Sequence, residues 1–324
     1  MAEGRVRVGA VDCGTNSIRL LVADVDPATG ALEDVLRRME IVRLGHGVDR
    51  TGLIAPESME RTLRVTREYA AQCHELGAER IRFVATSASR DARNAGEFIE
   101  GVRDAFREHV GVAVSPEVVS GDAEAALSFA GATGGLAARG IAGPYLVVDL
   151  GGGSTELVRG TDHVEAARSV DVGCVRMTER HLAGDPPTAE EVAAATRDID
   201  AALDLAESTV PLEGIGALVG LAGSVTTITA HLLRLPAYDA SRIHLSRNPV
   251  QDVLAACDDL LAMTRAARAD LPYLHPGRVD VIGAGALVWR RVVERLVDRS
   301  GVTDVVTSEH DILDGIALSA ARRD

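Results

Sequence analysis

One motif that occurs twice constrains the fold of this chain more than any other feature of its sequence. An apolar run followed by Asp, any residue, Gly, two further residues and Ser occupies residues 8–20 (VGAVDCGTNSIRL) and again residues 146–157 (LVVDLGGGSTEL). One constant interval separates the matching residues of the two copies: Asp12, Gly14 and Ser17 in the first, and Asp149, Gly151 and Ser154 in the second. Because array repeats have much shorter periods, this interval indicates a duplicated domain, each half of which begins with a β-hairpin turned at its glycines.

Strand patterns alternate with helix patterns in the rest of the chain. The expected strands include residues 80–85, 217–221 and 279–282, and the expected helices include residues 56–76, a helix from residue 121 and residues 189–209. Such alternation is typical of α/β domains. The glycine-rich residues 131–143 carry little pattern, so we expect an N-terminal domain at residues 1–130 and a C-terminal domain at residues 131–324, with the last helix packing on the first domain.

Charge and composition exclude several classes of function. The chain has 34 Lys+Arg against 48 Asp+Glu and a formal net charge of -14, so we expect neither a nucleic-acid nor a membrane partner. Residues 214–233 lack charge but contain glycines and polar residues, and we expect a buried strand and glycine loop there. All of the Lys+Arg residues are Arg, which excludes the lysine of a GxxxxGK phosphate loop and any Schiff-base lysine.

The cysteines and histidines point to neither a zinc site nor a disulfide framework. The 4 Cys lie far apart without CxxC spacing, and the 9 His form no HExxH pattern. This usage favours a reducing compartment, so we expect a cytoplasmic protein.

The duplicated motif itself suggests phosphate chemistry. A strand that ends in Asp-x-Gly-x-x-Ser places a carboxylate at the edge of a sheet, beside a turn whose N–H groups can face an anion. Two such turns can hold one phosphate chain, with each Asp placed to bind a divalent cation directly or through water. A tight hairpin turn without function explains either copy alone equally well, and it is the duplication that favours function.

The chain also resembles the exopolyphosphatase/guanosine pentaphosphatase (Ppx/GppA) family, a branch of the actin-like ATPase superfold. The resemblance rests on ordered motifs over nearly the whole chain: VDCGTNSIRLLVADV, RLGHGVDRTGLIAPESMERT, ATSASRDARN, VVSGDAEAALSFAG, VVDLGGGSTELV, GLAGSVTTITA, DVIGAGALV and DILDGIA. It implies two ribonuclease-H-like α/β domains around a cleft, in the short form of the family. It also implies that terminal phosphoanhydride bonds of inorganic polyphosphate, or of guanosine pentaphosphate (pppGpp) in the stringent response, are hydrolysed with release of phosphate.

The resemblance assigns roles to particular residues. It implies that Glu124 is the catalytic base, that Asp149 and Glu156 place Mg²⁺ (or Mn²⁺) and the catalytic water, and that Asp12 is the matching metal-side carboxylate of the first domain. The implied substrate contacts come from both glycine turns and one basic position: Gly14, Thr15, Asn16, Ser17, Arg90, Gly151, Gly152, Gly153 and Ser154. Relatives commonly carry a second Glu where this chain has Ala123.

Several alternatives stay open. A capping box with Ser120 or Gly121 also explains a glutamate at position 124, in the first turn of a helix. Solvent-facing positions on strands also explain Glu156 and Arg19. A small-molecule kinase of the same superfold is the rival enzyme, because GLAGSVTT resembles an adenosine-binding loop, and a phosphate or nucleotide sensor is the rival without catalysis. We further expect a homodimer, and an exposed tail at Arg323.

Overall fold

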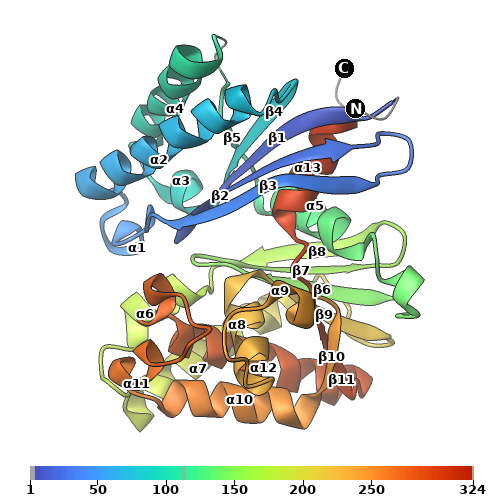
Figure 1. Cartoon of the computed structure of the whole chain (residues 1–324). Coiled ribbons are helices and arrows are strands. Elements are labelled where there is room, and N and C mark those ends of the chain that lie inside the picture. Colours follow the sequence, from blue (N-terminus) through green and yellow to red (C-terminus); the bar gives the residue numbers. More distant parts are fainter. Residues whose placement is uncertain (1–3, 112–113, 323–324) are drawn as a thin grey trace. The chain divides into compact units, whose positions relative to one another are not determined.

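The chain forms two compact units in a computed structural model that describes residues 4–111 and 114–322 (Figure 1). Unit 1 consists of Met1–Gly134 and Ile312–Asp324, and unit 2 of Gly135–Asp311. The boundary expected after residue 130 falls inside the helix α5 (Gly121–Thr133), and the last helix belongs to unit 1 rather than to the second unit. Arg323 lies outside the described residues.

Unit 1 is a five-stranded sheet with helices on both faces. Its strands are β1 (Val6–Cys13), β2 (Ser17–Val25), β3 (Leu32–Ile41), β4 (Arg80–Ala85) and β5 (Glu117–Val118). Its helices are α1 (Val48–Thr51), α2 (Pro56–Glu75), α3 (Ser87–Asp91), α4 (Ala95–Val110), α5 and α13 (Ile312–Arg322). The strand order is β3-β2-β1-β4-β5, with β2 antiparallel to both of its neighbours and β4 and β5 parallel to β1.

The alternation of side chains along β1 divides the core of unit 1 between two helix layers. Val11 packs with apolar residues of α2 and α4, whereas Val8 and Ala10 pack with those of α5 and α13. The apolar side of α13, which includes Ile312 and Ile316, explains why this helix joins unit 1, because it completes that second layer.

Unit 2 repeats the same order of strands. Its strands are β6 (Tyr145–Leu150), β7 (Thr155–Gly160), β8 (Val164–Val170), β9 (Ala217–Leu221), β10 (Ser246–Pro249) and β11 (Asp304–Thr307). Its helices are η1 (Ala137–Arg139), α6 (Cys174–His181), α7 (Ala189–Glu207), α8 (Ala222–Leu232), α9 (Ala240–Ile243), α10 (Val250–Ala262), α11 (Arg265–Ala269), η2 (Pro276–Arg278) and α12 (Ile282–Ser300). The order β10-β11-β9-β6-β7-β8 contains the unit 1 pattern, with β6 to β8 in place of β1 to β3 and β9 and β11 in place of β4 and β5. The predicted duplication and both glycine-turned hairpins are confirmed.

The strand predicted at residues 279–282 is wrong. Residues 279–281 form a turn, and Ile282 begins the helix α12. The first two turns of α12, from Ile282 to Trp289, are buried on all sides, so the sequence there shows an apolar run without helical period. Gly283 lets the guanidinium of Arg268 pack directly against the helix, since a Cβ would overlap it.

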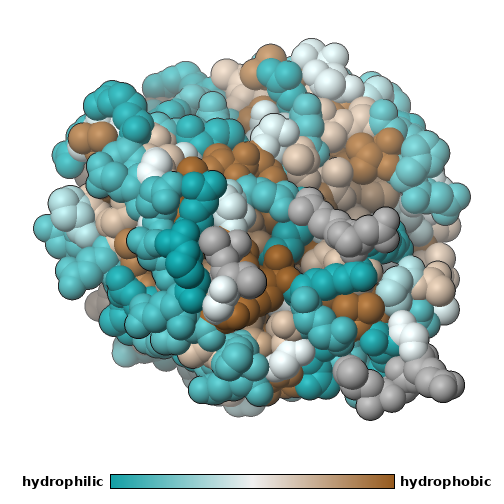
Figure 2. All heavy atoms as spheres, turned by 90° about the horizontal axis from the view of Figure 1, so that it is seen from above, coloured by the Kyte–Doolittle hydropathy of each residue, from teal (hydrophilic) through white to brown (hydrophobic). Residues whose placement is uncertain are grey.

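In Figure 2 hydrophilic residues predominate on the visible face, with hydrophobic residues between them. The exposed large hydrophobic side chains among the described residues are Val35, Leu53, Val118, Leu205 and Tyr238. The 4 cysteines are all buried as free thiols. Across the described residues, no helix combines the length and apolar composition needed to cross a bilayer.

Candidate active site

The carboxyl ends of three parallel strands bring candidate residues together in unit 1. The first glycine turn follows β1, α3 follows β4, and α5 follows β5, and parallel strands present these ends at one edge of their sheet. The hydroxyls of Thr15 and Ser87 lie 2.7 Å apart, which joins the turn to α3. Arg90, on α3, lies 3.2 Å from Glu124, on α5.

Glu124 is a buried carboxylate at the start of α5. Ser120 is the N-cap, and its hydroxyl accepts a hydrogen bond from the Ala123 N–H at 3.3 Å. The N3 position of a capping box is therefore held by Ala123, so that explanation of Glu124 is wrong. Arg90 Nη1 donates to Glu124 Oε2 at 3.2 Å and to the Val119 carbonyl at 3.0 Å. Arg90 thus holds the Glu124 carboxylate at the amino end of the helix, where a negative charge is stabilised.

Asp12 and Arg19 form an ion pair across the first hairpin. The two residues are directly opposite in β1 and β2, so their side chains lie on the same face of the sheet. Arg19 donates to Asp12 Oδ2 from Nε at 2.9 Å and from Nη2 at 2.7 Å, and Asp12 is 5% exposed. Arg19 is thus engaged at the site and is not a solvent-facing strand residue.

Asp149 and Glu156 occupy the corresponding positions of the second hairpin. They are directly opposite in β6 and β7, with exposures of 7% and 1%, which rules out a solvent-facing Glu156. Ser169, opposite Glu156 on β8, donates its hydroxyl to Glu156 Oε1 at 2.7 Å. The second hairpin therefore presents two buried carboxylates where the first presents a carboxylate and a guanidinium.

This pair of carboxylates fits a hard divalent cation. Like charges directly opposite across two strands are unfavourable, and a bound cation offsets that repulsion. Within the described part of the chain, no group of three or more His, Cys, Asp or Glu side chains is arranged to hold a metal ion. Mg²⁺ is usually bound through one or two carboxylates and keeps several waters, which a pair of carboxylates allows.

The two glycine turns are closed by the same backbone hydrogen bond. In the first turn the Gly14 N–H donates to the Ser17 carbonyl at 3.0 Å, and in the second the Gly151 N–H donates to the Ser154 carbonyl at 3.0 Å. The turn that closes each hairpin is therefore duplicated together with its sequence.

Two features of the second unit were not predicted from the sequence. Arg278 Nη1 donates to the Gly223 carbonyl at 3.1 Å and lies where a Cβ of residue 223 would be, so a positive charge sits at the start of α8. Because β6 and β9 are parallel, this helix start shares its edge of the sheet with Asp149. Arg176 on α6 holds the second glycine turn by a hydrogen bond to Gly153. Neither arginine lies within the duplicated motif, and only the glycines that they contact were a signal in the sequence.

Two units with one shared strand order, each with a glycine turn after its first strand, define a protein of the actin-like ATPase superfold. The model of the Ppx/GppA phosphatase family matches residues 21–320, and the chain belongs to that family. The resemblance inferred from the motifs is confirmed.

Curated and solved relatives agree with this assignment. The chain is 51% identical over 320 residues to Exopolyphosphatase 2 of Mycobacterium tuberculosis. The matched region covers 97% of this chain and 98% of that protein. The crystal structure of an exopolyphosphatase-like protein matches with a TM-score of 0.93 at 43% identity and covers 99% of both chains. A PPX-GPPA enzyme of Aquifex aeolicus matches with a TM-score of 0.78 at 29% identity and covers 97% of this chain and 99% of that one.

Proposed function

We propose that the protein is an exopolyphosphatase that hydrolyses the terminal phosphoanhydride bond of inorganic polyphosphate and releases phosphate. The observation that carries this proposal is the pair of glycine turns, each closed by the same hydrogen bond and beside a buried aspartate, in a member of a phosphatase family. The relative named Exopolyphosphatase 2, with 51% identity over almost the whole chain, supports polyphosphate as the substrate. Guanosine pentaphosphate is the second candidate, because it offers the same terminal bond.

Each proposed role follows from the surroundings of the residue. Glu124 orients the attacking water and accepts its proton, and Arg90 fixes the Glu124 carboxylate and adds positive charge beside the phosphates. Each turn also binds phosphate oxygens through N–H groups other than those of Gly14 and Gly151, which already donate within their own turns. A chain without lysine must supply its positive charge from arginine or from a metal ion.

Mg²⁺ or Mn²⁺ is the proposed cofactor. In unit 2 Asp149 and Glu156 would hold it. In unit 1 the matching Asp12 would bind a cation through water, because Arg19 already occupies one Asp12 oxygen. When bound, the ion would neutralise phosphate charge during transfer. The buried free thiols support a reducing compartment, and we propose a cytoplasmic homodimer.

A single assay separates the candidates. Phosphate release is measured from long polyphosphate, tripolyphosphate and guanosine pentaphosphate, each with Mg²⁺ or with EDTA, and ATP is tested with and without candidate acceptors. The proposal expects release from polyphosphate with Mg²⁺ and no acceptor. ATP consumption that depends on an acceptor would instead identify a kinase, and binding of polyphosphate without any phosphate release would identify a sensor.

A further inference from the structure

The carbonyl groups of the second glycine turn are all held by the segment that follows β8. The Cys174 N–H donates to the Gly151 carbonyl at 3.0 Å, and the Val175 N–H donates to the Gly152 carbonyl at 2.8 Å. The next carbonyl, of Gly153, is held by a side chain, since Arg176 Nε donates to it at 2.6 Å. The first turn of α6 therefore contacts three successive carbonyls of the glycine turn.

Fixing these carbonyls fixes the direction of the N–H groups. In a trans peptide the carbonyl of one residue and the N–H of the next point in opposite directions in one plane. The N–H groups of Gly152, Gly153 and Ser154 therefore point away from α6. Among the described residues, no acceptor is recorded for these three N–H groups, and Gly153 and Ser154 are buried. Buried N–H groups without a partner are rare in folded proteins, and an anion supplies the missing acceptor.

In unit 1 a segment of different sequence also holds carbonyls of the glycine turn. The Asn16 carbonyl accepts from the N–H groups of Val42 at 3.0 Å and Arg43 at 2.8 Å, and the Thr15 carbonyl accepts from the Gly45 N–H at 2.8 Å. In both units the contacting segment follows the third strand of the sheet, β3 or β8. Both segments also need a glycine, because a Cβ on Gly45 would overlap Thr15 and a Cβ on Gly173 would overlap Gly152. The contacts of the first turn come from backbone N–H groups, whereas the Gly153 carbonyl of the second turn is held by an arginine side chain.

We propose that Arg176 is a positioning residue for phosphate binding: it holds the Gly153 carbonyl so that the Ser154 N–H faces a phosphate oxygen. The proposal rests on the proposed function and adds a residue to it. Arg176 acts through the backbone of the turn, and its own charge is not the source of the effect.

The test measures binding of a bis-methylene analogue of tripolyphosphate, whose P–C–P bridges resist hydrolysis, by calorimetry with Mg²⁺. In the variant Arg176→Met the Kd should rise about ten-fold, as expected for the loss of one well-aligned hydrogen bond to a charged group. The rise should persist at high salt, because it comes from the orientation of a peptide group rather than from long-range charge. With polyphosphate as substrate, KM should rise by more than kcat falls. Arg176→Lys should recover part of the affinity, since its ammonium can still donate to a carbonyl.

Arg180→Met is the matched control, because it removes the same charge from the same helix. Arg180 Nη1 donates to Asp198 on α7 at 3.3 Å. The control should bind the analogue as the wild type does. If both variants raise the Kd equally, and high salt abolishes their difference from the wild type, the effect comes from the net charge and the inference is wrong.

The remaining outcomes separate this inference from the proposed function. A wild-type protein that releases phosphate while Arg176→Met behaves as the wild type would overturn the role of Arg176 and leave the function intact. A protein that binds the analogue through Arg176 but releases no phosphate would overturn the function and leave the positioning role intact. If the wild type fails to bind the analogue, both are wrong.

Discussion

Glu124 and Asp122 occupy the same first turn of α5 but differ in surroundings. Glu124 is buried beside Arg90, whereas Asp122 is exposed. Glu124→Gln keeps the shape of the side chain and removes the proton acceptor, so kcat should fall by roughly 10²-fold or more while polyphosphate still binds. Steady-state phosphate release checks this, with Asp122→Asn as the control. Near-normal kcat in Glu124→Gln would remove Glu124 from the mechanism.

Asp149 differs from Asp12 in what lies opposite it, a glutamate rather than an arginine. A neutral amide is a poorer ligand for a hard cation than a carboxylate. Asp149→Asn should therefore raise the Mg²⁺ concentration that gives half the maximal rate, which a Mg²⁺ titration of phosphate release measures. An unchanged Mg²⁺ dependence would show that Asp149 serves the fold alone.

Helix α13 packs on α5 through a glycine. A Cβ on Gly315 would overlap the carbonyl oxygen of Leu127, one turn beyond Glu124, and Asp314 lies 2.6 Å from Arg37 on β3. Gly315→Ala must separate the two helices, so we expect the free energy of unfolding to fall by about 1–3 kcal/mol. Denaturant unfolding followed by circular dichroism measures this. Gly134→Ala is the control, because its backbone is already helical and nothing lies within 4 Å of the added Cβ.

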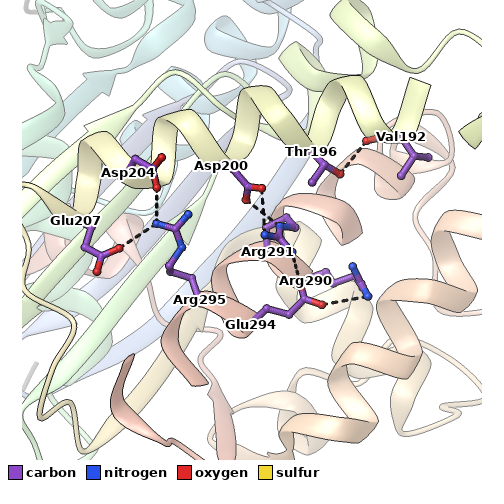
Figure 3. Close-up of polar contacts among 9 residues, drawn as sticks. All are labelled: Val192, Thr196, Asp200, Asp204, Glu207, Arg290, Arg291, Glu294 and Arg295. Carbon is purple, nitrogen blue, oxygen red and sulfur yellow. Dashed lines mark hydrogen bonds and ion pairs between the residues drawn. The ribbon is translucent and has the colours of Figure 1, made fainter. Parts of the chain in front are cut away.

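Helices α7 and α12 are joined by a row of ion pairs (Figure 3). Arg291 lies 2.9 Å from Asp200, and Arg295 lies 2.7 Å from Asp204 and 2.9 Å from Glu207. Burial of Glu207 favours its neutral form, but hydrogen bonds from Arg295 and Arg299 outweigh this and hold the pKa of Glu207 below its ordinary value of 4.5. A lowered pKa in the folded state means that the pair stabilises above pH 4.5 and loses this contribution as the pH falls through the folded pKa.

Arg295→Met tests this row of ion pairs. At pH 7 it should lower the free energy of unfolding by about 1 kcal/mol, and the difference from the wild type should shrink as the pH falls and Glu207 takes up a proton in both proteins. Denaturant unfolding followed by the fluorescence of the single Trp, the buried Trp289 of α12, measures it. Arg64→Met, at an exposed pair with Glu68, should change stability little. A difference that stays constant down to acid pH would contradict the assignment.

At the scale of the whole molecule, the repeated elements were predictable and the contacts between distant segments were not. The apolar strand followed by Asp-x-Gly identified both hairpins, because this pattern is local. The apolar run at residues 279–282 predicts a strand, because a helix buried on all sides loses its period. Three arginines make contacts that a single sequence does not reveal. The contact of Arg19 depends on strand register, and those of Arg176 and Arg278 join segments that are distant in the sequence.

The net charge of -14 opposes the approach of a polyanion, so local arginines must offset it. Arg90→Ala should raise KM for long polyphosphate by more than it lowers kcat, and the rise should shrink as salt screens charge over a Debye length of about 8 to 10 Å. Kinetics at several salt concentrations check this. Arg107, on the exposed side of α4 and paired with Asp104, is the control, and its replacement by Ala should leave KM unchanged. If Arg107→Ala alters KM and Arg90→Ala does not, the basic path for polyphosphate lies elsewhere.

The four buried cysteines can serve as native probes of local opening in each unit. Each unit holds two cysteines, Cys13 and Cys73 in unit 1 and Cys174 and Cys257 in unit 2, and burial raises the pKa of all four, that of Cys73 to about 12. Only an exposed thiolate reacts with an alkylating reagent, so each cysteine is modified only when its surroundings open. Mass spectrometry that resolves the alkylation rate at each of the four sites would thus follow local opening of each unit separately. A ligand that reduces opening of one unit would slow the alkylation of that unit's two cysteines.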